Sequence, residues 1–252
     1  MSLPTRPKVI FFDLDDTLFD HQYSEDRGMA VARHTVPIPK DKPLDELKMA
    51  LTSAQNNSKK HYKSGLMSKE ESRNEGIRSF FSKVGFEDYN DQHVKVFRAA
   101  HKRGYYEFVT PTPGTLAALT ILKDRGFKIV IITNSCQESQ LAKLRCMGME
   151  HLIDRLICSR EFGASKPDQQ IFLHAMEISG IANYMLHDGG KTFMVGDSIR
   201  CDIKGALAVG LEPVLFSLKE PEGETFVCGD EVPVINNMLQ LLTVLESHDS
   251  LW

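Results

Sequence analysis

The stretch VIFFDLDDTLFD, residues 9–20, runs from four apolar residues directly into a cluster of acids. Its apolar start is typical of a buried strand, and Asp13 and Asp15 follow at alternating positions. Because successive strand residues point to opposite faces, both carboxylates are expected on the same side, roughly 7 Å apart. At that distance two unit charges repel by roughly 2 kcal/mol near a protein surface. Nothing in the local sequence offsets this cost, so the pair indicates a cation site or chemistry that uses two carboxylates.

The bulk composition is that of an ordinary soluble globular protein. Its 252 residues suffice for one large domain, or for one domain with a smaller insert. No apolar run approaches the roughly 20 residues of a membrane span, and the apolar stretch near the N-terminus is too short for a signal peptide. The net charge of -4 gives no reason to expect a nucleic-acid polymer as a partner. The composition therefore favours neither a membrane protein nor a nucleic-acid-binding protein.

The five cysteines show neither a CxxC pair nor the spacing of a metal site. An odd number of cysteines without a secretory signal predicts reduced thiols and a cytoplasmic location. The sequence leaves the oligomeric state open between monomer and dimer.

Residues 21–107 carry helical patterns and little strand pattern. Ser68 and Glu71 stand in capping-box register at the start of one of these helices. Phe80, Phe81 and Phe97 are predicted to form the core between the helices. The segment is also net basic, whereas the rest of the chain is net acidic. These features predict an all-helical domain inserted into the chain.

From residue 114 onward, helical patterns alternate with short apolar runs. The runs predicted as strands are KIVIITN, RLIC, TFMVGD and EPVLF, and IRCDIKGALAVG is predicted as a helix. This alternation implies right-handed crossovers and a parallel sheet with both faces covered. The expected fold is α/β: an open, Rossmann-like parallel-sheet core of residues 1–20 and 108–252, with residues 21–107 inserted as a helical cap.

Polar residues stand at the carboxyl ends of several predicted strands, which is where such sheets bind ligands. Thr133 and Asn134 close one strand, Lys166 precedes a proline and a helix, and Asp197 and Asp202 follow another strand. Helix capping explains several of these residues singly. Their convergence with Asp13 and Asp15 on one edge is better explained by a shared ligand. Carboxylate oxygens suit Mg²⁺, and a hydroxyl and an ammonium group suit phosphoryl oxygens.

These motifs resemble those of the haloacid dehalogenase-like superfamily, in particular its phosphatases with a small helical cap. DLDDT is similar to the first motif, TN to the second, SKPD to the third and GDSIRCD to the fourth. Within this branch the chain looks nearest to the nucleotidases and N-acylneuraminate-9-phosphatases. The resemblance implies a Mg²⁺-dependent hydrolase that cleaves a small phosphate ester, a nucleotide or sugar phosphate, through an aspartyl-phosphate.

The resemblance also implies roles for the acids. Asp13 is expected to be the nucleophile and Asp15 the general acid and base. Asp13, the backbone carbonyl of Asp15 and Asp197 are expected to bind Mg²⁺, with Asp202 supporting the metal site from outside the ligand set.

Thr133, Asn134 and Lys166 are expected to bind the phosphate, and Lys166 also to orient the nucleophile. In the cap, Tyr62 and Arg73 near a turn between two helices are the candidate specificity residues.

Other functions fit the sequence less well. A calcium-binding EF-hand loop starting at Asp13 needs a glycine where Leu18 stands and a glutamate where Ser24 stands. A receiver-like signalling domain places its lysine after all the acids, whereas Lys166 precedes Asp197, and it has no helical insert. A metal-free 2-haloacid dehalogenase lacks the second acid of the first motif, which is Asp15 here. A phosphomutase of the same superfamily shares all four motifs and stays open, as does a catalytically silent binding protein.

Overall fold

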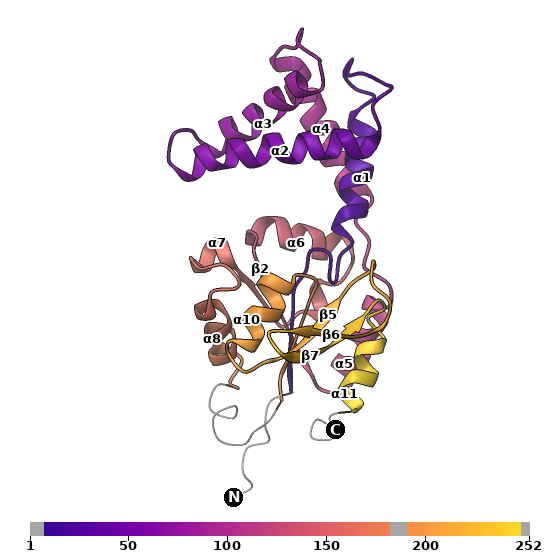
Figure 1. Ribbon diagram of the computed structural model, residues 1–252, viewed down its shortest axis with the longest axis vertical. Coiled ribbons are helices and arrows are strands. Elements are labelled where there is room, and N and C mark those ends of the chain that lie inside the picture. The colour runs from indigo at the N-terminus through magenta and orange to yellow at the C-terminus, as the bar shows by residue number, and fades with distance from the viewer. Residues whose placement is uncertain (1–7, 182–190, 248–252) are drawn as a thin grey trace, which may run out of the picture. The chain divides into compact units, whose positions relative to one another are not determined.

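The computed structural model describes residues 8–181 and 191–247, and the chain divides into two compact units. The chain up to Asp20 and from Thr110 onward forms an α/β unit, and His21–Val109 forms a helical unit (Figure 1). The sequence places the second boundary after residue 107, and the structure places it after residue 109.

The α/β unit is built on a seven-stranded sheet in the order β3-β2-β1-β4-β5-β7-β6. The strands in this order are β3 (Arg155–Cys158), β2 (Lys128–Thr133), β1 (Val9–Phe12), β4 (Phe193–Gly196), β5 (Glu212–Phe216), β7 (Asp230–Ile235) and β6 (Gly223–Val227). Every neighbouring pair is parallel except β6 and β7. The predicted α/β fold class is therefore confirmed, and β1, which leads directly into Asp13, is an inner strand between β2 and β4.

Helices cover both faces of the sheet, as the alternation of strands and helices predicts. Figure 1 shows α8 (Gln169–Ile178) and α10 (Lys204–Leu207) on one side, and α5 (Thr115–Asp124) and α11 (Gln240–Glu246) on the other. The remaining helical segments of this unit are α6 (Gln137–Cys146), α7 (Ser159–Phe162) and a 3₁₀ turn, Glu150–Leu152. On the α8 face, alternate residues of β1 and β2 pack with apolar residues of α8 into one buried cluster.

The sequence missed the antiparallel hairpin of β6 and β7, whose turn has no common sequence signature. Cys228 and Gly229 form the connection, and both have positive φ, at 56° and 95°. Two-residue hairpin turns of this kind favour Asn-Gly or Asp-Gly, and a cysteine at the first position conceals the turn. Phe226 on β6 is also largely exposed, which breaks the alternation expected of a strand with one buried face.

The helix predicted over residues 199–210 is present from Ile199 to Leu207, but its first half is not an α-helix. A π-helical turn, Ile199–Ile203, comes first and α10 follows it. The Ser198 carbonyl accepts hydrogen bonds from the N–H groups of both Asp202 and Ile203. The wider turn brings Asp202 back against the end of β4. The hydrogen bonds to the Ser198 carbonyl therefore help to position this buried acid.

The helical unit contains α1 (His21–Ala32), α2 (Leu44–Lys63), α3 (Lys69–Lys83) and α4 (Asp91–Glu107). The capping box at the start of α3 is confirmed, with Ser68 and Glu71 bonded reciprocally. Phe80, Phe81 and Phe97 are fully buried and contact one another edge-on or tilted, which confirms their predicted core role. Burying each of these rings contributes roughly 1.5–3 kcal/mol.

Within residues 8–181 and 191–247, no helix combines the length and the apolar character that crossing a membrane requires.

Candidate active site

Asp13 follows the carboxyl end of β1 and is almost fully buried. Its backbone N–H donates to the carbonyl of Val195 at 2.8 Å, which extends the pairing of β1 with β4 by one residue. The residue is only 7% exposed, and one carboxylate oxygen lies 2.5 Å from the Lys166 ammonium nitrogen. The inner strand β1 therefore holds this carboxylate in one place, and a lysine far along the chain pairs with it.

Lys166 connects two acids at this edge of the sheet. Its ammonium nitrogen lies 2.5 Å from an oxygen of Asp13 and 2.6 Å from an oxygen of Asp202. The other oxygen of Asp202 accepts from the backbone N–H of Ser198 at 3.0 Å. Burial by itself lowers the pKa of Lys166, but the two carboxylates outweigh it and raise that pKa. The lysine is therefore charged, and it is shared between Asp13 and Asp202.

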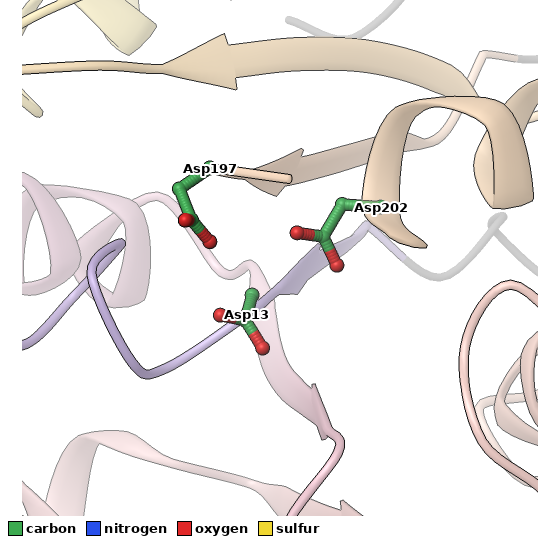
Figure 2. Close-up of side chains that lie close together, drawn as sticks. All are labelled: Asp13, Asp197 and Asp202. Carbon is green, nitrogen blue, oxygen red and sulfur yellow. The ribbon is translucent and has the colours of Figure 1, made fainter. Parts of the chain in front are cut away.

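A cluster of three acids could hold a metal ion. Asp13, Asp197 and Asp202 each bring a carboxylate oxygen within 4.8 Å of the others (Figure 2). Asp197 follows β4 directly and is exposed, whereas Asp13 and Asp202 are buried. A donor set made only of carboxylate oxygens suits a hard divalent cation such as Mg²⁺.

The pKa values of the cluster indicate a shortage of positive charge. Burial raises the pKa of Asp13 to about 8, because the opposing effect of Lys166 is too weak and Asp202 and Asp15 add repulsion. The pKa of Asp197 is raised to about 7, because its carboxyl group is partly desolvated even though the residue as a whole is exposed, and because Asp202 and Asp16 add repulsion. A cation bound among these carboxylates would favour their ionised forms. The residues present therefore fit Mg²⁺, in agreement with the prediction of an acidic metal site.

Gly196, the last residue of β4, explains why the fourth motif begins with glycine. A Cβ atom built at this position lies 2.4 Å from the Cβ and Cγ atoms of Asp202 and 2.5 Å from one of its oxygens. No side chain fits there while Asp202 stays in place. The π-helical turn can therefore approach β4 closely only because position 196 is a glycine, which has no side chain.

We expect Gly196→Ala to impair both activity and stability. The methyl group must displace Asp202 from Lys166, and overpacking of this kind costs about 1–3 kcal/mol. Phosphatase turnover and the free energy of unfolding in urea measure the two effects. Gly126→Ala is the control, since Gly126 has a φ of 80° but open space at its Cβ position. It should lower stability through backbone strain and leave turnover unchanged. Normal turnover in Gly196→Ala would contradict the prediction.

Thr133 and Asn134 lie at the carboxyl end of β2, next to β1. Thr133 is buried, and its hydroxyl oxygen accepts from the side-chain amide of Gln140 at 3.1 Å. The Asn134 side chain instead forms a two-point contact with the backbone of Lys166, accepting from its N–H at 2.8 Å and donating to its carbonyl at 2.9 Å. This contact fixes the backbone that carries Lys166. The phosphate-binding roles of Thr133, Asn134 and Lys166 stay predictions.

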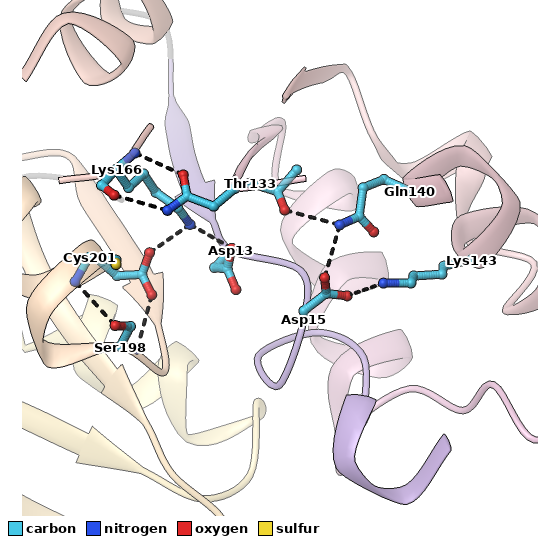
Figure 3. Close-up of polar contacts among 10 residues, drawn as sticks. Asp13, Asp15, Thr133, Gln140, Lys143, Lys166, Ser198 and Cys201 are labelled. Atoms are coloured by element: carbon cyan, nitrogen blue, oxygen red, sulfur yellow. Dashed lines mark hydrogen bonds and ion pairs between the residues drawn. The ribbon is translucent and has the colours of Figure 1, made fainter. Parts of the chain in front are cut away.

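Asp15 does not join the acidic cluster through its carboxylate, but contacts α6 (Figure 3). One oxygen lies 2.5 Å from the Lys143 ammonium nitrogen, and the other accepts from Gln140 at 3.0 Å. Asp13 and Asp15 are thus each paired with a lysine, and these two ammonium groups offset part of the repulsion between the carboxylates. The sequence missed Gln140 and Lys143. Their spacing of three predicts a shared helix face, but a polar pair of this kind is usually solvent-exposed.

The structure brings Asp13, Lys166, Asp197 and Asp202 together, with Thr133 and Asp15 linked through Gln140. Two predicted residues lie in the helical unit: Tyr62 at the end of α2 and Arg73 on α3. Both are exposed, and Arg73 lies 3.7 Å from Glu70. Their role in substrate selection stays a prediction.

A buried aspartate at the end of a central parallel strand, paired with a lysine and surrounded by further carboxylates, defines an α/β enzyme site. Residues 7–210 match the haloacid dehalogenase-like hydrolase family, and the chain belongs to this family. The resemblance seen in the four motifs is confirmed, and so is the prediction that the chain is an enzyme of this family's phosphatase type.

The relatives are phosphatases of small molecules by name. The chain is 24% identical over 246 residues to a glyceraldehyde 3-phosphate phosphatase from Methanothermobacter thermautotrophicus, covering 94% of this chain and 99% of that one. It is also 24% identical over 272 aligned positions to an N-acylneuraminate-9-phosphatase from Rattus norvegicus, covering 97% and 96%. Among solved structures, the magnesium-bound hydrolase YfnB from Bacillus subtilis is 20% identical, with a TM-score of 0.67 and coverage of 96% and 100%. This structural similarity supports the assignment of the fold alone.

Proposed function

We propose that this chain is a Mg²⁺-dependent phosphomonoester hydrolase that acts on a small phosphorylated metabolite, a sugar phosphate or a nucleotide. The observation that carries the proposal is the position of Asp13, buried at the end of the inner strand β1 and held by Lys166 within an acidic cluster. The names of the relatives support a small phosphate ester as the substrate class.

Asp13 is the proposed nucleophile. One of its oxygens attacks phosphorus, the bond from phosphorus to the ester oxygen breaks, and an aspartyl-phosphate remains. Lys166 touches Asp13 at 2.5 Å, so it fixes the direction of the carboxylate and offsets charge on the phosphoryl oxygens. Water then attacks the aspartyl-phosphate, releasing inorganic phosphate and restoring the carboxylate of Asp13.

Asp15 is the proposed general acid and base. It gives a proton to the departing ester oxygen in the first step and takes one from the attacking water in the second step. The hydroxyl of Thr133 is proposed to donate to a phosphoryl oxygen. Thr133 already accepts a hydrogen bond from Gln140, so its own hydrogen points elsewhere and is available for this contact.

Asp13 and Asp197 are the proposed side-chain ligands of Mg²⁺, together with the backbone carbonyl of Asp15. When bound, the ion supplies positive charge against the phosphoryl oxygens. Asp202 is proposed to stay outside the ligand set, because Lys166 and the Ser198 N–H already occupy its two oxygens. It thereby holds Lys166 in position.

The helical unit is proposed to be a cap that selects the leaving group and excludes water during the reaction. It is inserted directly after the loop that carries Asp13 and Asp15, and it is net basic, which suits a phosphorylated ligand.

We expect Tyr62→Ala and Arg73→Ala to lower turnover of the best metabolite substrate by about 10-fold, the usual size of one lost specificity contact. Turnover of a small aryl phosphate should change little, because that substrate needs only the α/β unit. Met49→Ala is the control, since Met49 is a strongly exposed residue of the same unit. Equal losses on both substrates would mean that these residues only support the fold.

The proposed function is tested by measuring inorganic phosphate released from a panel of sugar phosphates, nucleoside monophosphates and small phosphorylated acids with Mg²⁺. We expect at least one ester to be hydrolysed far faster than an aryl phosphate. The same panel separates the alternatives. A phosphomutase would give an isomeric sugar phosphate without free phosphate, and a dehalogenase would release halide from a 2-haloacid. Either outcome would contradict the proposal.

A further inference from the structure

Two buried side chains of α6, Gln140 and Lys143, contact the carboxylate of Asp15. Gln140 is fully buried and Lys143 is 5% exposed, and they stand three residues apart, so they share one face of the helix. The face they share meets both oxygens of one carboxylate: Lys143 lies 2.5 Å from one and Gln140 lies 3.0 Å from the other (Figure 3). With a donor on each oxygen, the carboxylate cannot rotate without breaking a contact.

The burial of Lys143 makes this contact strong. Its side chain is 6% exposed, whereas that of Asp15 is 30% exposed. The ammonium group also lies 5.0 Å from the centre of the Phe19 ring, which is itself buried. A charge removed from water in this way depends on a charged partner close by. Asp15 is that partner, although 128 residues separate the two in the sequence.

Gln140 connects the carboxylate to the second motif. Its amide nitrogen donates to Asp15 at 3.0 Å and to the Thr133 hydroxyl oxygen at 3.1 Å. Both partners accept, so the amide nitrogen must face them and the amide oxygen must face away. Among the described residues that oxygen is buried without a hydrogen-bond partner. A glutamine that only supported the fold would avoid this cost, which favours a role in the site.

We infer that Gln140 and Lys143 are positioning residues that hold the Asp15 carboxylate in the orientation needed to exchange a proton with the ester oxygen. This inference rests on the proposed function, in which Asp15 is the general acid and base. In the first step, the effect of the pair on Asp15 should depend on whether the leaving group needs a proton, whereas the attack of water in the second step is the same for every ester. Here the sequence DLDDT supplies the acid and the sequence QLAK supplies its alignment.

The test compares leaving groups. The variants are Lys143→Met and Gln140→Met, which keep side-chain length and remove the donors. The matched controls on the same helix are Arg145→Met, whose side chain is 63% exposed and pairs with Glu150, and Gln137→Met, which is exposed. The substrates are phenyl phosphate, whose leaving group needs a proton, and 2,4-dinitrophenyl phosphate, whose leaving group does not. Thermal melting checks that each variant folds.

We expect kcat/KM of Lys143→Met on phenyl phosphate, which reports formation of the aspartyl-phosphate, to fall by about 10- to 100-fold, a fraction of the 10²–10⁴-fold worth of a positioned acid. On 2,4-dinitrophenyl phosphate, kcat/KM of Lys143→Met and of Gln140→Met should stay within about threefold of the wild-type value. The double variant Asp15→Asn/Lys143→Met should be no slower than Asp15→Asn alone, because the lysine has no carboxylate left to position. Arg145→Met and Gln137→Met should match the wild type on both esters.

Equal losses of kcat/KM on both esters, or additive losses in the double variant, would overturn the inference, because Lys143 would then support the fold or act independently of Asp15. If Asp15→Asn itself shows no dependence on the leaving group, the proposed acid role of Asp15 fails. If Asp15→Asn shows that dependence and Lys143→Met and Gln140→Met do not, the positioning inference alone fails.

Discussion

Asp13→Asn is expected to abolish phosphatase turnover, with a loss of about 10⁴-fold or more, as for other removed nucleophiles. The amide has the same shape as the carboxylate but cannot form the aspartyl-phosphate, so later steps never begin. Because Asp13 is paired with Lys166 and buried, the substitution also leaves the lysine more dependent on Asp202. Steady-state phosphate release measures the loss.

Two controls separate chemistry from folding. Asp124→Asn, an equivalent change at an exposed position on α5, should keep full turnover. Acid quenching of the wild-type protein during turnover should leave phosphate on the peptide that contains residues 9–20, and Asp13→Asn should carry none. Near-normal turnover of Asp13→Asn would place the nucleophile elsewhere and remove the basis of the proposed mechanism.

Local sequence signals predicted those elements that local forces decide. Ser68 and Glu71 form their capping box, which depends only on residues three positions apart. The apolar run RLIC also marks β3 with the same bounds, although its pairing with β2 is not local. The convergence of four strand ends could also be predicted, since parallel strands joined by crossovers carry their carboxyl ends to one edge. On this basis the sequence alone predicts that Asp13, Lys166 and Asp197 lie at the same edge of the sheet.

Contacts between distant segments could not be predicted in the same way. Lys143 and Gln140 meet Asp15 only because β1 and β2 are neighbours and α6 begins just past the end of β2. In the sequence they are polar residues of a helix, and most such residues face water. The π-helical turn before α10 could not be predicted either. The position of Asp202 in this turn depends on its pairing with Lys166 and on the absence of a side chain at Gly196.

Removal of divalent cations is expected to abolish hydrolysis, and addition of Mg²⁺ to restore it. Without a cation, the carboxyl groups of Asp13 and Asp197 have raised pKa values, so the nucleophile is partly protonated, and no bound ion offsets the charge of a phosphate dianion. Charge stabilisation of several kcal/mol then corresponds to a rate loss of about 10³-fold or more. The rate of phosphate release in excess chelator, and its recovery on titration with Mg²⁺, measures the rate loss. Ca²⁺ should inhibit, because it accepts more ligands in a looser geometry.

Binding can be separated from catalysis in the same experiment. If Asp13 and Asp197 hold the ion, Mg²⁺ should raise the melting temperature of the wild-type protein, because an ion that binds only the folded state stabilises it. The rise should be much smaller in Asp197→Asn, which keeps the shape of the exposed ligand and removes its charge. Asp168→Asn is the matched control: Asp168 caps α8, and asparagine caps a helix equally well, so the Mg²⁺ response should persist. Full hydrolysis in excess chelator, or an unchanged melting response in Asp197→Asn, would rule out a metal site built on these carboxylates. The raised pKa values would then reflect only the desolvation of the two carboxyl groups and their crowding with neighbouring acids.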